Sequence, residues 1–232
     1  MTDKYNFDEI IDRRGTDSVK WDLAKDADVL PMWVADMDFK TAPEITEAIL
    51  KKVSHGIFGY SITPDLFFDA IIDWYQDIYH FKIKKEWILP GPGMIPTLSS
   101  VLRTFVKSGE NIIIQPPVYN HFYNLLENCE LDLVENNLIY QNGTYQIDFD
   151  DFELKASDPE TRLFLLCNPH NPVGRVWKKN ELEKIAEICS KHKVMVVSDE
   201  IHADLVFDGQ QHIPFASIAS NYDVESVTCG SP

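Results

Sequence analysis

The 232-residue sequence predicts an α/β fold, with a mostly parallel sheet flanked by helices. Short runs rich in Ile, Val and Leu recur along the chain, as at Ile112–Ile114, and stretches with apolar residues at helical spacing separate them. No repeat or low-complexity segment interrupts this alternation. Parallel strands joined by helices are the economical arrangement for such a pattern, with right-handed crossovers.

Two helices are expected in the first third of the chain. The first is predicted from about Pro43 to Lys52, because Ile45, Ala48 and Ile49 share one face and a proline occupies the first turn. The second is predicted from Pro64 to about Tyr79. Its inner face is expected to carry Phe67, Phe68, Ile71, Ile72, Tyr75 and Ile78. These aromatic residues are interpreted as core rather than as ligand contacts.

The middle of the chain is expected to form one strand–helix–strand unit and a hairpin. From Glu86 the pattern predicts a strand, a glycine turn, a helix that ends at Gly109, and a buried strand over Ile112–Ile114. Asn142-Gly143 lies between LIY and YQI, as a hairpin turn does. This interpretation is preferred over the glycosylation acceptor that the same tripeptide matches.

The last third predicts further units of the same kind. Strands are expected over Arg162–Cys167, Val194–Ser198 and Val224–Cys229, with a helix over Glu181–His192 between the first two.

The hydrophobic content and net charge of the chain exclude several classes of function. Hydrophobic residues make up 44% of the chain, which suits one large domain with a sizeable core. The formal net charge of -16 argues against non-specific nucleic-acid or anionic-membrane binding, although a local pocket can still take a small anion. No apolar run approaches the roughly 18 residues of a spanning helix, and the charged N-terminus is unlike a signal peptide, so a cytoplasmic location is expected.

The cysteines are spaced like neither a metal site nor a redox motif. In a reducing compartment they are expected to be free thiols. They are Cys129, Cys167, Cys189 and Cys229.

Ligands of open α/β sheets collect beyond the carboxyl ends of the strands, so the loops that follow the predicted strands are candidate sites. The segment Pro90–Ile95 combines glycines with a helix start whose N–H groups are free, which outlines an anion site. Glycine and proline also mark ordinary turns, and this segment lacks the third glycine of a dinucleotide fingerprint.

Three further loops present polar residues. Tyr119 follows two prolines after Ile114, two Asn-Pro pairs around one histidine follow Cys167, and Asp199 ends the strand that contains Val197. Taken alone, a carboxylate such as Asp199 is more often a helix cap or a surface ion pair.

Together these loops resemble the aspartate-aminotransferase-like superfamily of pyridoxal-phosphate enzymes, class I/II. The superfamily motifs are N-P-H-N-P-V-G at 168–174 and S-D-E-I-H at 198–202. The cystathionine β-lyase or C–S lyase branch, often called MalY/PatB-like, is the nearest match within it. The segments that carry this second resemblance are W-V-A-D-M-D-F at 33–39, H-G-I-F-G-Y-S at 55–61, P-P-V-Y at 116–119 and S-D-E-I-H-A-D at 198–204.

The resemblance implies a domain organisation and an assembly. Residues 1–45 would form an N-terminal arm and part of the small domain, and residues 46–232 the large cofactor-binding domain, incomplete at its C-terminus. It also implies pyridoxal 5'-phosphate as the cofactor, a small amino-acid substrate and a homodimer.

The same resemblance implies roles for individual residues. Asp199, the expected catalytic residue, would pair with the pyridine nitrogen of the cofactor, which then acts as the electron sink for a carbanion. Asn171 would bind the phenolic oxygen and help to orient the substrate carboxylate; the alternative is a proline-locked loop with a satisfied asparagine. Tyr119 would stack on the cofactor ring, with core packing as its alternative.

The remaining cofactor contacts are implied in the same way. Backbone N–H groups of Met94 and Ile95 would hold the phosphate. His202 stands where many relatives carry a tyrosine that contacts the phenolic oxygen, and Tyr60 would reach the phosphate of a neighbouring subunit.

The resemblance also requires a lysine that forms a Schiff base with the cofactor, and no lysine lies between Lys193 and Pro232. The chain is therefore expected to be the first part of a longer enzyme and inactive alone. For the whole protein, a C–S lyase is expected that cleaves cystathionine or related cysteine conjugates to a thiol, pyruvate and ammonia. An aminotransferase of the same fold and a non-catalytic binding or regulatory protein are the alternatives.

Overall fold

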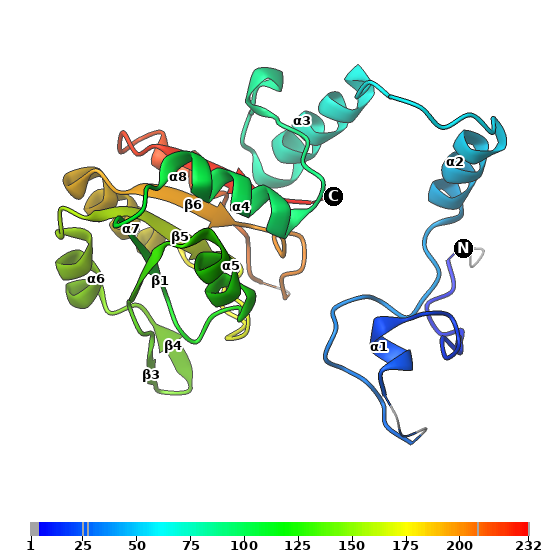
Figure 1. The fold of residues 1–232 in the computed structure, drawn as a ribbon, viewed down its shortest axis with the longest axis horizontal. Coiled ribbons are helices and arrows are strands. Elements are labelled where there is room, and N and C mark those ends of the chain that lie inside the picture. Colours follow the sequence, from blue (N-terminus) through cyan, green and yellow to red (C-terminus); the bar gives the residue numbers. More distant parts are fainter. Residues whose placement is uncertain (1–4, 25, 27, 208, 232) are drawn as a thin grey trace. The chain divides into compact units, whose positions relative to one another are not determined.

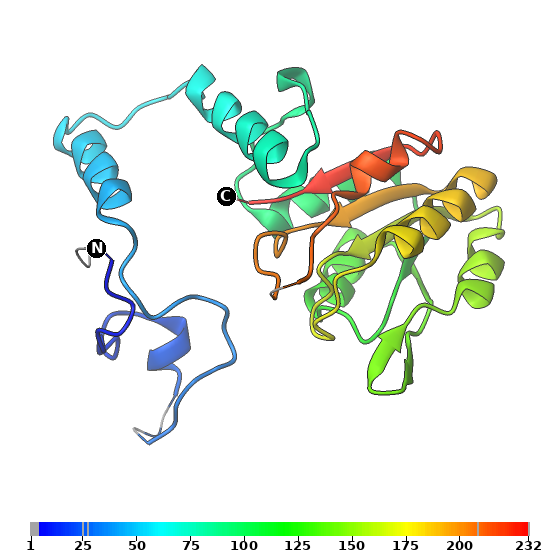
Figure 2. The same cartoon turned by 180° about the vertical axis from the view of Figure 1, so that it is seen from behind.

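The computed structural model describes residues 5–24, 26, 28–207 and 209–231. The chain divides into two compact units, Met1–Ile62 and Thr63–Pro232. Figures 1 and 2 show the ribbon from opposite sides. The domain boundary that the resemblance implies, between residues 45 and 46, stays a prediction.

The first unit contains α1 (Val19–Asp22), α2 (Pro43–Ser54) and a polar cluster around Asp38. Two side chains reach the same carboxylate oxygen of Asp38 at 2.7 Å, Nη1 of Arg13 and Nε1 of Trp21, and Nζ of the buried Lys20 reaches the other at 2.6 Å. Hydrogen bonds from Lys20, Trp21 and Arg13 hold the pKa of Asp38 well below its usual range. This cluster organises the W-V-A-D-M-D-F segment around its second aspartate.

The second unit is built on a five-stranded sheet with all neighbouring strands parallel, in the order β2-β1-β5-β6-β7. The parallel sheet expected from the alternating pattern is therefore confirmed. Its strands are β1 (Asn111–Ile114), β2 (Asp132–Glu135), β5 (Thr161–Cys167), β6 (Met195–Asp199) and β7 (Ser226–Cys229).

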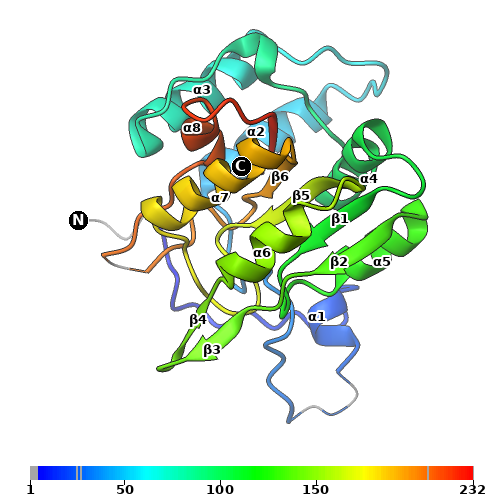
Figure 3. The same cartoon turned by 90° about the vertical axis from the view of Figure 1, so that its left-hand side faces the viewer.

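Helices cover both faces of this sheet, and alternate side chains of each strand enter the two resulting cores. Ile113, Phe164 and Val196 face a core with α6 (Phe149–Ala156), α7 (Lys179–His192) and α8 (Phe215–Ala219). Ile112, Leu165 and Val197 face the opposite core, with α4 (Met94–Phe105) and α5 (His121–Cys129). Figure 1 shows α4 and α5 in front of the sheet; Figure 3 shows α6 and α7 side by side over it.

Several expected elements form close to their predicted limits. The helix predicted from Pro43 is α2, and the helix predicted from Pro64 is α3 (Asp65–Tyr79), for which Pro64 is the N-cap. No side chain of α3 is fully buried, so its expected inner face is only partly covered by the described chain. Asn142 and Gly143, with φ angles of 53° and 78°, connect β3 (Ile139–Gln141) to β4 (Thr144–Gln146), which confirms the hairpin turn.

Two expectations near the middle of the chain are wrong. The segment from Glu86 forms no strand: Lys85–Trp87 is a 3-10 turn, η1, and Ile88 and Leu89 belong to neither sheet of the described chain. Leu89 is 87% exposed. Helix α4 ends at Phe105 rather than at Gly109, because Val106 is already extended. Glu110 then accepts a hydrogen bond from the backbone of Lys107 at 2.8 Å and closes the turn before β1.

All four cysteines are buried free thiols, as expected. Every helix within the described ranges is too short or too polar to span a bilayer.

Candidate active site

The candidate site lies at the carboxyl ends of β1, β5, β6 and β7, where a parallel sheet gathers its loops. Backbone hydrogen bonds continue past the strands and hold these loops in register. The N–H of Asn168 donates to the carbonyl of Asp199, and the N–H of Glu200 donates to the carbonyl of Cys229, both at 2.9 Å. The loop after β5 and the turn after β6 are therefore fixed to one another at the sheet edge.

Asp199 is the last residue of β6 and is only 4% exposed. One carboxylate oxygen accepts a hydrogen bond from the backbone N–H of Ile201 at 3.1 Å; the other has no hydrogen-bond partner among the described residues. Burial raises the pKa of Asp199 to about 6, with a further increase from the neighbouring Glu200 and a decrease from the Ile201 hydrogen bond. Asp199 is thus neither a helix cap nor a surface ion pair, the two alternatives that its sequence position leaves open.

Two cysteines flank Asp199 on the neighbouring strands. Cys167 of β5 and Cys229 of β7 are its register partners. Burial, and then the charge of Asp199, raise the pKa of each thiol to about 12. Both therefore stay protonated near neutral pH and act as weakly polar walls beside the carboxylate.

The two asparagines of N-P-H-N-P-V-G differ in burial and in hydrogen bonding. Asn168 is fully buried; its side-chain oxygen accepts from the N–H of Trp177 at 3.2 Å and its amide donates to the carbonyl of Ile213 at 3.4 Å. Asn171 is half-buried, its N–H meets the sulfur of Cys167 at 3.4 Å, and its carboxamide has no hydrogen bond within the described ranges. Asn168 is therefore structural, and Asn171 has its carboxamide available for a ligand.

His170, between the two asparagines, joins this loop to the one after β1. Its Nε2 lies 3.1 Å from the carbonyl of Pro117, so this nitrogen carries the hydrogen and donates. Burial lowers the pKa of His170 to about 4, which keeps the ring neutral at physiological pH. The Asn168–Pro169, Asn171–Pro172 and Pro116–Pro117 peptide bonds are cis.

Tyr119 and the start of α4 belong to the same hydrophobic cluster as Cys167. The Tyr119 ring is half-buried and lies 4.9 Å from the ring of His121, centroid to centroid. The cluster also includes the partly buried side chains of Met94 and Ile95. These contacts bring three of the predicted site residues to one region of the second unit.

The backbone N–H groups of Met94 and Ile95 have no partner within the described chain, because the first helical hydrogen bond of α4 runs from Thr97 to the carbonyl of Gly93 at 3.1 Å. Gly91 packs tightly against this first turn. A Cβ atom at Gly91 would lie 2.1 Å from Oγ1 of Thr97, so any larger residue would clash with this threonine unless its side chain moved.

His202 and Tyr60 are less constrained. His202 is half-buried in the turn after Asp199, and its imidazole makes no hydrogen bond among the described residues. Tyr60 lies in the first unit with its side chain fully exposed. The roles expected for these two residues stay predictions.

A polar network behind Asp199 was missed by the sequence reasoning. Glu200 and His212 are both buried, with 2.9 Å between Oε2 and Nε2. Glu200 stands inside the quoted S-D-E-I-H motif, but its partner lies 12 residues further on. In the sequence, the only signal was a glutamate directly after the aspartate of the motif, at the end of an apolar run.

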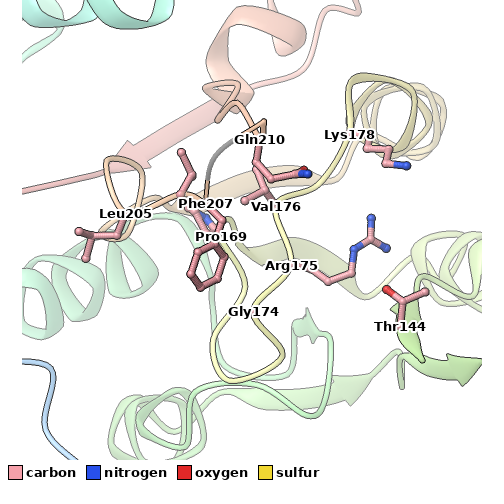
Figure 4. A pocket seen from close by; sticks show the side chains of 10 residues that line it. Thr144, Pro169, Gly174, Arg175, Val176, Lys178, Leu205, Phe207 and Gln210 are labelled. Atoms are coloured by element: carbon pink, nitrogen blue, oxygen red, sulfur yellow. The ribbon is translucent and has the colours of Figure 1, made fainter.

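A hollow of about 240 Å3 lies between the N-P-H-N-P-V-G loop and the loop after Ala203. Figure 4 shows Phe207 beside Pro169 at one side of the hollow and Arg175 at the opposite side. The Arg175 guanidinium already contacts Glu181 at 2.7 Å and the carbonyl of Tyr145 at 2.6 Å. None of the predicted site residues lines this hollow, although Pro169 and Gly174 of the N-P-H-N-P-V-G loop do.

A family model described as aminotransferase class I and II matches residues 27–231. Cystathionine beta-lyase PatB of Bacillus subtilis is 45% identical over 98% of this chain and 60% of its own length. Protein MalY of Escherichia coli is 37% identical over 98% and 59%. The chain thus spans about 60% of the length of these curated relatives.

Solved structures agree with these matches. A putative aminotransferase from Clostridium difficile with bound pyridoxal phosphate superposes with a TM-score of 0.93 at 42% identity, over 98% of this chain and 60% of that one. Cystalysin from Treponema denticola, which contains pyridoxal 5'-phosphate, superposes with a TM-score of 0.93 at 36% identity, over 98% and 59%. The aminotransferase-like fold expected from the motifs is confirmed.

Proposed function

Because the chain belongs to the class I and II aminotransferase family, we propose that the complete protein is a pyridoxal-phosphate-dependent C–S lyase. It takes cystathionine or a related cysteine conjugate, breaks the Cβ–S bond and, with one water, yields a thiol, pyruvate and ammonia. The observation that carries this proposal is the buried Asp199, which ends a central strand with one carboxylate oxygen unused. The similarity to curated cystathionine beta-lyases favours elimination over transamination.

The polar groups of the site fit pyridoxal phosphate. An unpaired carboxamide at Asn171, an unused oxygen at Asp199 and two free N–H groups at the start of α4 match its phenolic oxygen, pyridine nitrogen and phosphate. When bound, the cofactor supplies an electron sink for the charge that develops at the substrate α-carbon.

Asp199 holds a proton at the pyridine nitrogen. An ionised carboxylate in a buried site favours the protonated form of a basic neighbour, and few solvent molecules remain to weaken the pair. The Cys167 and Cys229 thiols beside it carry no charge that competes for this proton.

The other predicted residues bind and orient. Asn171 donates to the phenolic oxygen and orients the substrate carboxylate, and Tyr119 offers its ring face to the cofactor. Met94 and Ile95 donate backbone N–H groups to the phosphate at the positive end of the helix dipole. His202 contacts the phenolic oxygen, and Tyr60 serves the phosphate site of a second subunit.

The assembly and location are part of the same proposal. The complete protein is a cytoplasmic homodimer that acts on a small amino-acid substrate. Residues 1–45 form an arm and part of a small domain, and residues 46–232 belong to the large domain.

Absorbance and product analysis of the complete purified protein test this function. After incubation with pyridoxal phosphate we expect an absorbance band above about 400 nm, typical of the protein-bound cofactor. Incubation with cystathionine should then release pyruvate, thiol and ammonia without any added oxo acid. A band with turnover only in the presence of an oxo acid would instead identify an aminotransferase, and the absence of both would contradict the family-based proposal.

A further inference from the structure

Inside the second unit, both oxygens of the buried Glu200 carboxylate have hydrogen-bond partners, one of which is His212. Oε1 of Glu200 accepts from the hydroxyl of Ser198 and from the N–H of Phe215, both at 2.8 Å. Oε2 lies 2.9 Å from Nε2 of His212, and since a carboxylate only accepts, the imidazole donates. Both side chains are 1% exposed. One buried carboxylate therefore links β6, the turn after it and the start of α8.

Aromatic residues of α3 close this network. The Tyr79 ring packs edge-on against His212 at 5.4 Å, centroid to centroid, and its hydroxyl donates to Asp204. The nearby Tyr75 has its pKa raised by burial first, and then by the charges of Glu200 and Asp204. The residues of α3 around the network are thus tyrosines whose raised pKa values keep them neutral near physiological pH, and Asp204 lies in the same turn as Glu200.

The network lies immediately behind Asp199. Successive side chains of an extended chain point to opposite sides, and Ser198 and Glu200 meet on one side at 2.8 Å. Asp199, between them, therefore faces the other way, toward the candidate site. The N–H of Glu200 also donates to the carbonyl of Cys229, which ties the turn to β7.

We propose that Glu200 is a positioning residue that acts on the cofactor through Asp199: its hydrogen bonds to Ser198, His212 and Phe215 fix the carboxyl end of β6, and its buried negative charge follows Asp199 directly in the chain, on the opposite side of the strand. The charge effect has a definite direction, because a like charge favours the protonated form of Asp199 and so contributes to its raised pKa. On the two neighbouring strands, the titratable groups in register with Asp199 are Cys167 on β5 and Cys229 on β7, both neutral thiols near physiological pH. This inference rests on the proposed function, since Asp199 must meet a cofactor.

The pH dependence of cofactor binding tests this inference in the complete protein. The apo protein is titrated with pyridoxal phosphate between pH 5 and 8.5 and the dissociation constant is read from fluorescence quenching. In the native protein we expect affinity to fall on the acid side as Asp199 takes up a proton, with a midpoint near its pKa of about 6. Asp199→Asn should remove this step and thereby assign it.

Glu200→Gln separates charge from shape. Its carboxamide oxygen can still accept from Ser198 and Phe215, and His212 can move its hydrogen to Nδ1, which has no partner in the described chain. We expect the variant to fold and its midpoint to move down by about half a pH unit. A midpoint equal to that of the native protein overturns the inference.

Glu200→Asp keeps the charge but is too short to keep all three hydrogen bonds. We expect the midpoint to stay and the dissociation constant to rise about tenfold at every pH, the size of effect expected from about one lost charge-assisted hydrogen bond. An unchanged dissociation constant contradicts the positioning role, and this variant decides the matter if Glu200→Gln does not fold. Glu187→Gln, at an exposed carboxylate on α7, is the matched control and should change neither quantity. A native protein that binds no cofactor at any pH contradicts the proposed function instead.

Discussion

Asp199→Asn should stabilise the apo protein at neutral pH while it disables the holoenzyme. The carboxamide has the shape of the carboxylate, and its oxygen can still accept the hydrogen bond from Ile201. What the substitution removes is a charge that is 4% exposed and has no basic partner among the described residues. Removing this charge should therefore favour the folded state of the apo protein. In the holoenzyme, where the cofactor would pair with the carboxylate, the same substitution removes a favourable interaction.

The magnitude follows from the pKa of Asp199. Folding raises this pKa from 3.8 to about 6, a difference of about 2 units, and each unit corresponds to about 1.4 kcal/mol, so ionised Asp199 costs about 3 kcal/mol of folding free energy. Because the folded state binds the proton more tightly, the cost is absent below about pH 4, grows as pH rises to about 6, and is constant above that.

Urea unfolding of the apo complete protein from pH 4.5 to 8, at one protein concentration, measures this difference. The free energy of unfolding of Asp199→Asn should exceed that of the native protein by up to about 3 kcal/mol at pH 7.5, and the gap should shrink toward pH 4.5. Asp132→Asn, at an exposed position on β2, should show no such trend. If Asp199→Asn is no more stable than the native protein at pH 7.5, or if the gap does not depend on pH, the burial argument is refuted.

Three further predictions concern the complete protein. Asp199→Ala should bind the cofactor more weakly and, with saturating cofactor, should lower kcat on cystathionine by about a hundredfold to a thousandfold, because the lost group acts on developing charge; near-normal turnover with bound cofactor would rule out its pairing with the pyridine nitrogen. Asn171→Ala should raise the KM for cystathionine and leave the unfolding midpoint near that of the native protein. Asn168→Ala should instead lose about 1 to 3 kcal/mol of stability in urea unfolding, because it leaves the backbone N–H of Trp177 unpaired. Gly91→Ala should lower the unfolding midpoint and the cofactor affinity, and adding Thr97→Ala should restore most of both by removing the hydroxyl 2.1 Å from the new Cβ; no recovery in the double variant would show that the clash is not the cause.

The strands, helices and turn that were predicted correctly have a sequence pattern within their own residues. The strands β1, β5 and β6 are continuous apolar runs because parallel strands are covered on both faces, and the Asn142-Gly143 turn needs two positive φ angles that these residues tolerate. The helices α2, α3 and α7 are amphipathic over 12 to 15 residues, which is long enough for the period to be evident.

The elements that were missed or misassigned depend on distant neighbours. Helices α5, α6 and α8 have 9, 8 and 5 residues, too few for a clear period, and β2 is a half-exposed edge strand without an apolar run. The segment after Glu86 has strand-like residues, but a strand exists only where another segment pairs with it. Pairing partners are chosen by the whole fold, so local composition predicts them poorly.

In the site too, some features were predictable from the sequence and others depend on distant neighbours. By itself the sequence determined which residues stand at the strand ends and, through its motifs, that Asn171 and Asp199 are the polar groups to test. Only the tertiary structure decided that Asn168 is structural while Asn171 keeps its carboxamide available, and that Glu200 pairs with His212. It also decided that Asp199 is buried between two thiols with a raised pKa. The physical reason is that hydrogen-bond partners and desolvation are set by groups that meet in space, and for Asp199 and Glu200 those groups come from β5, β7, α3 and the start of α8, all distant from them in the chain.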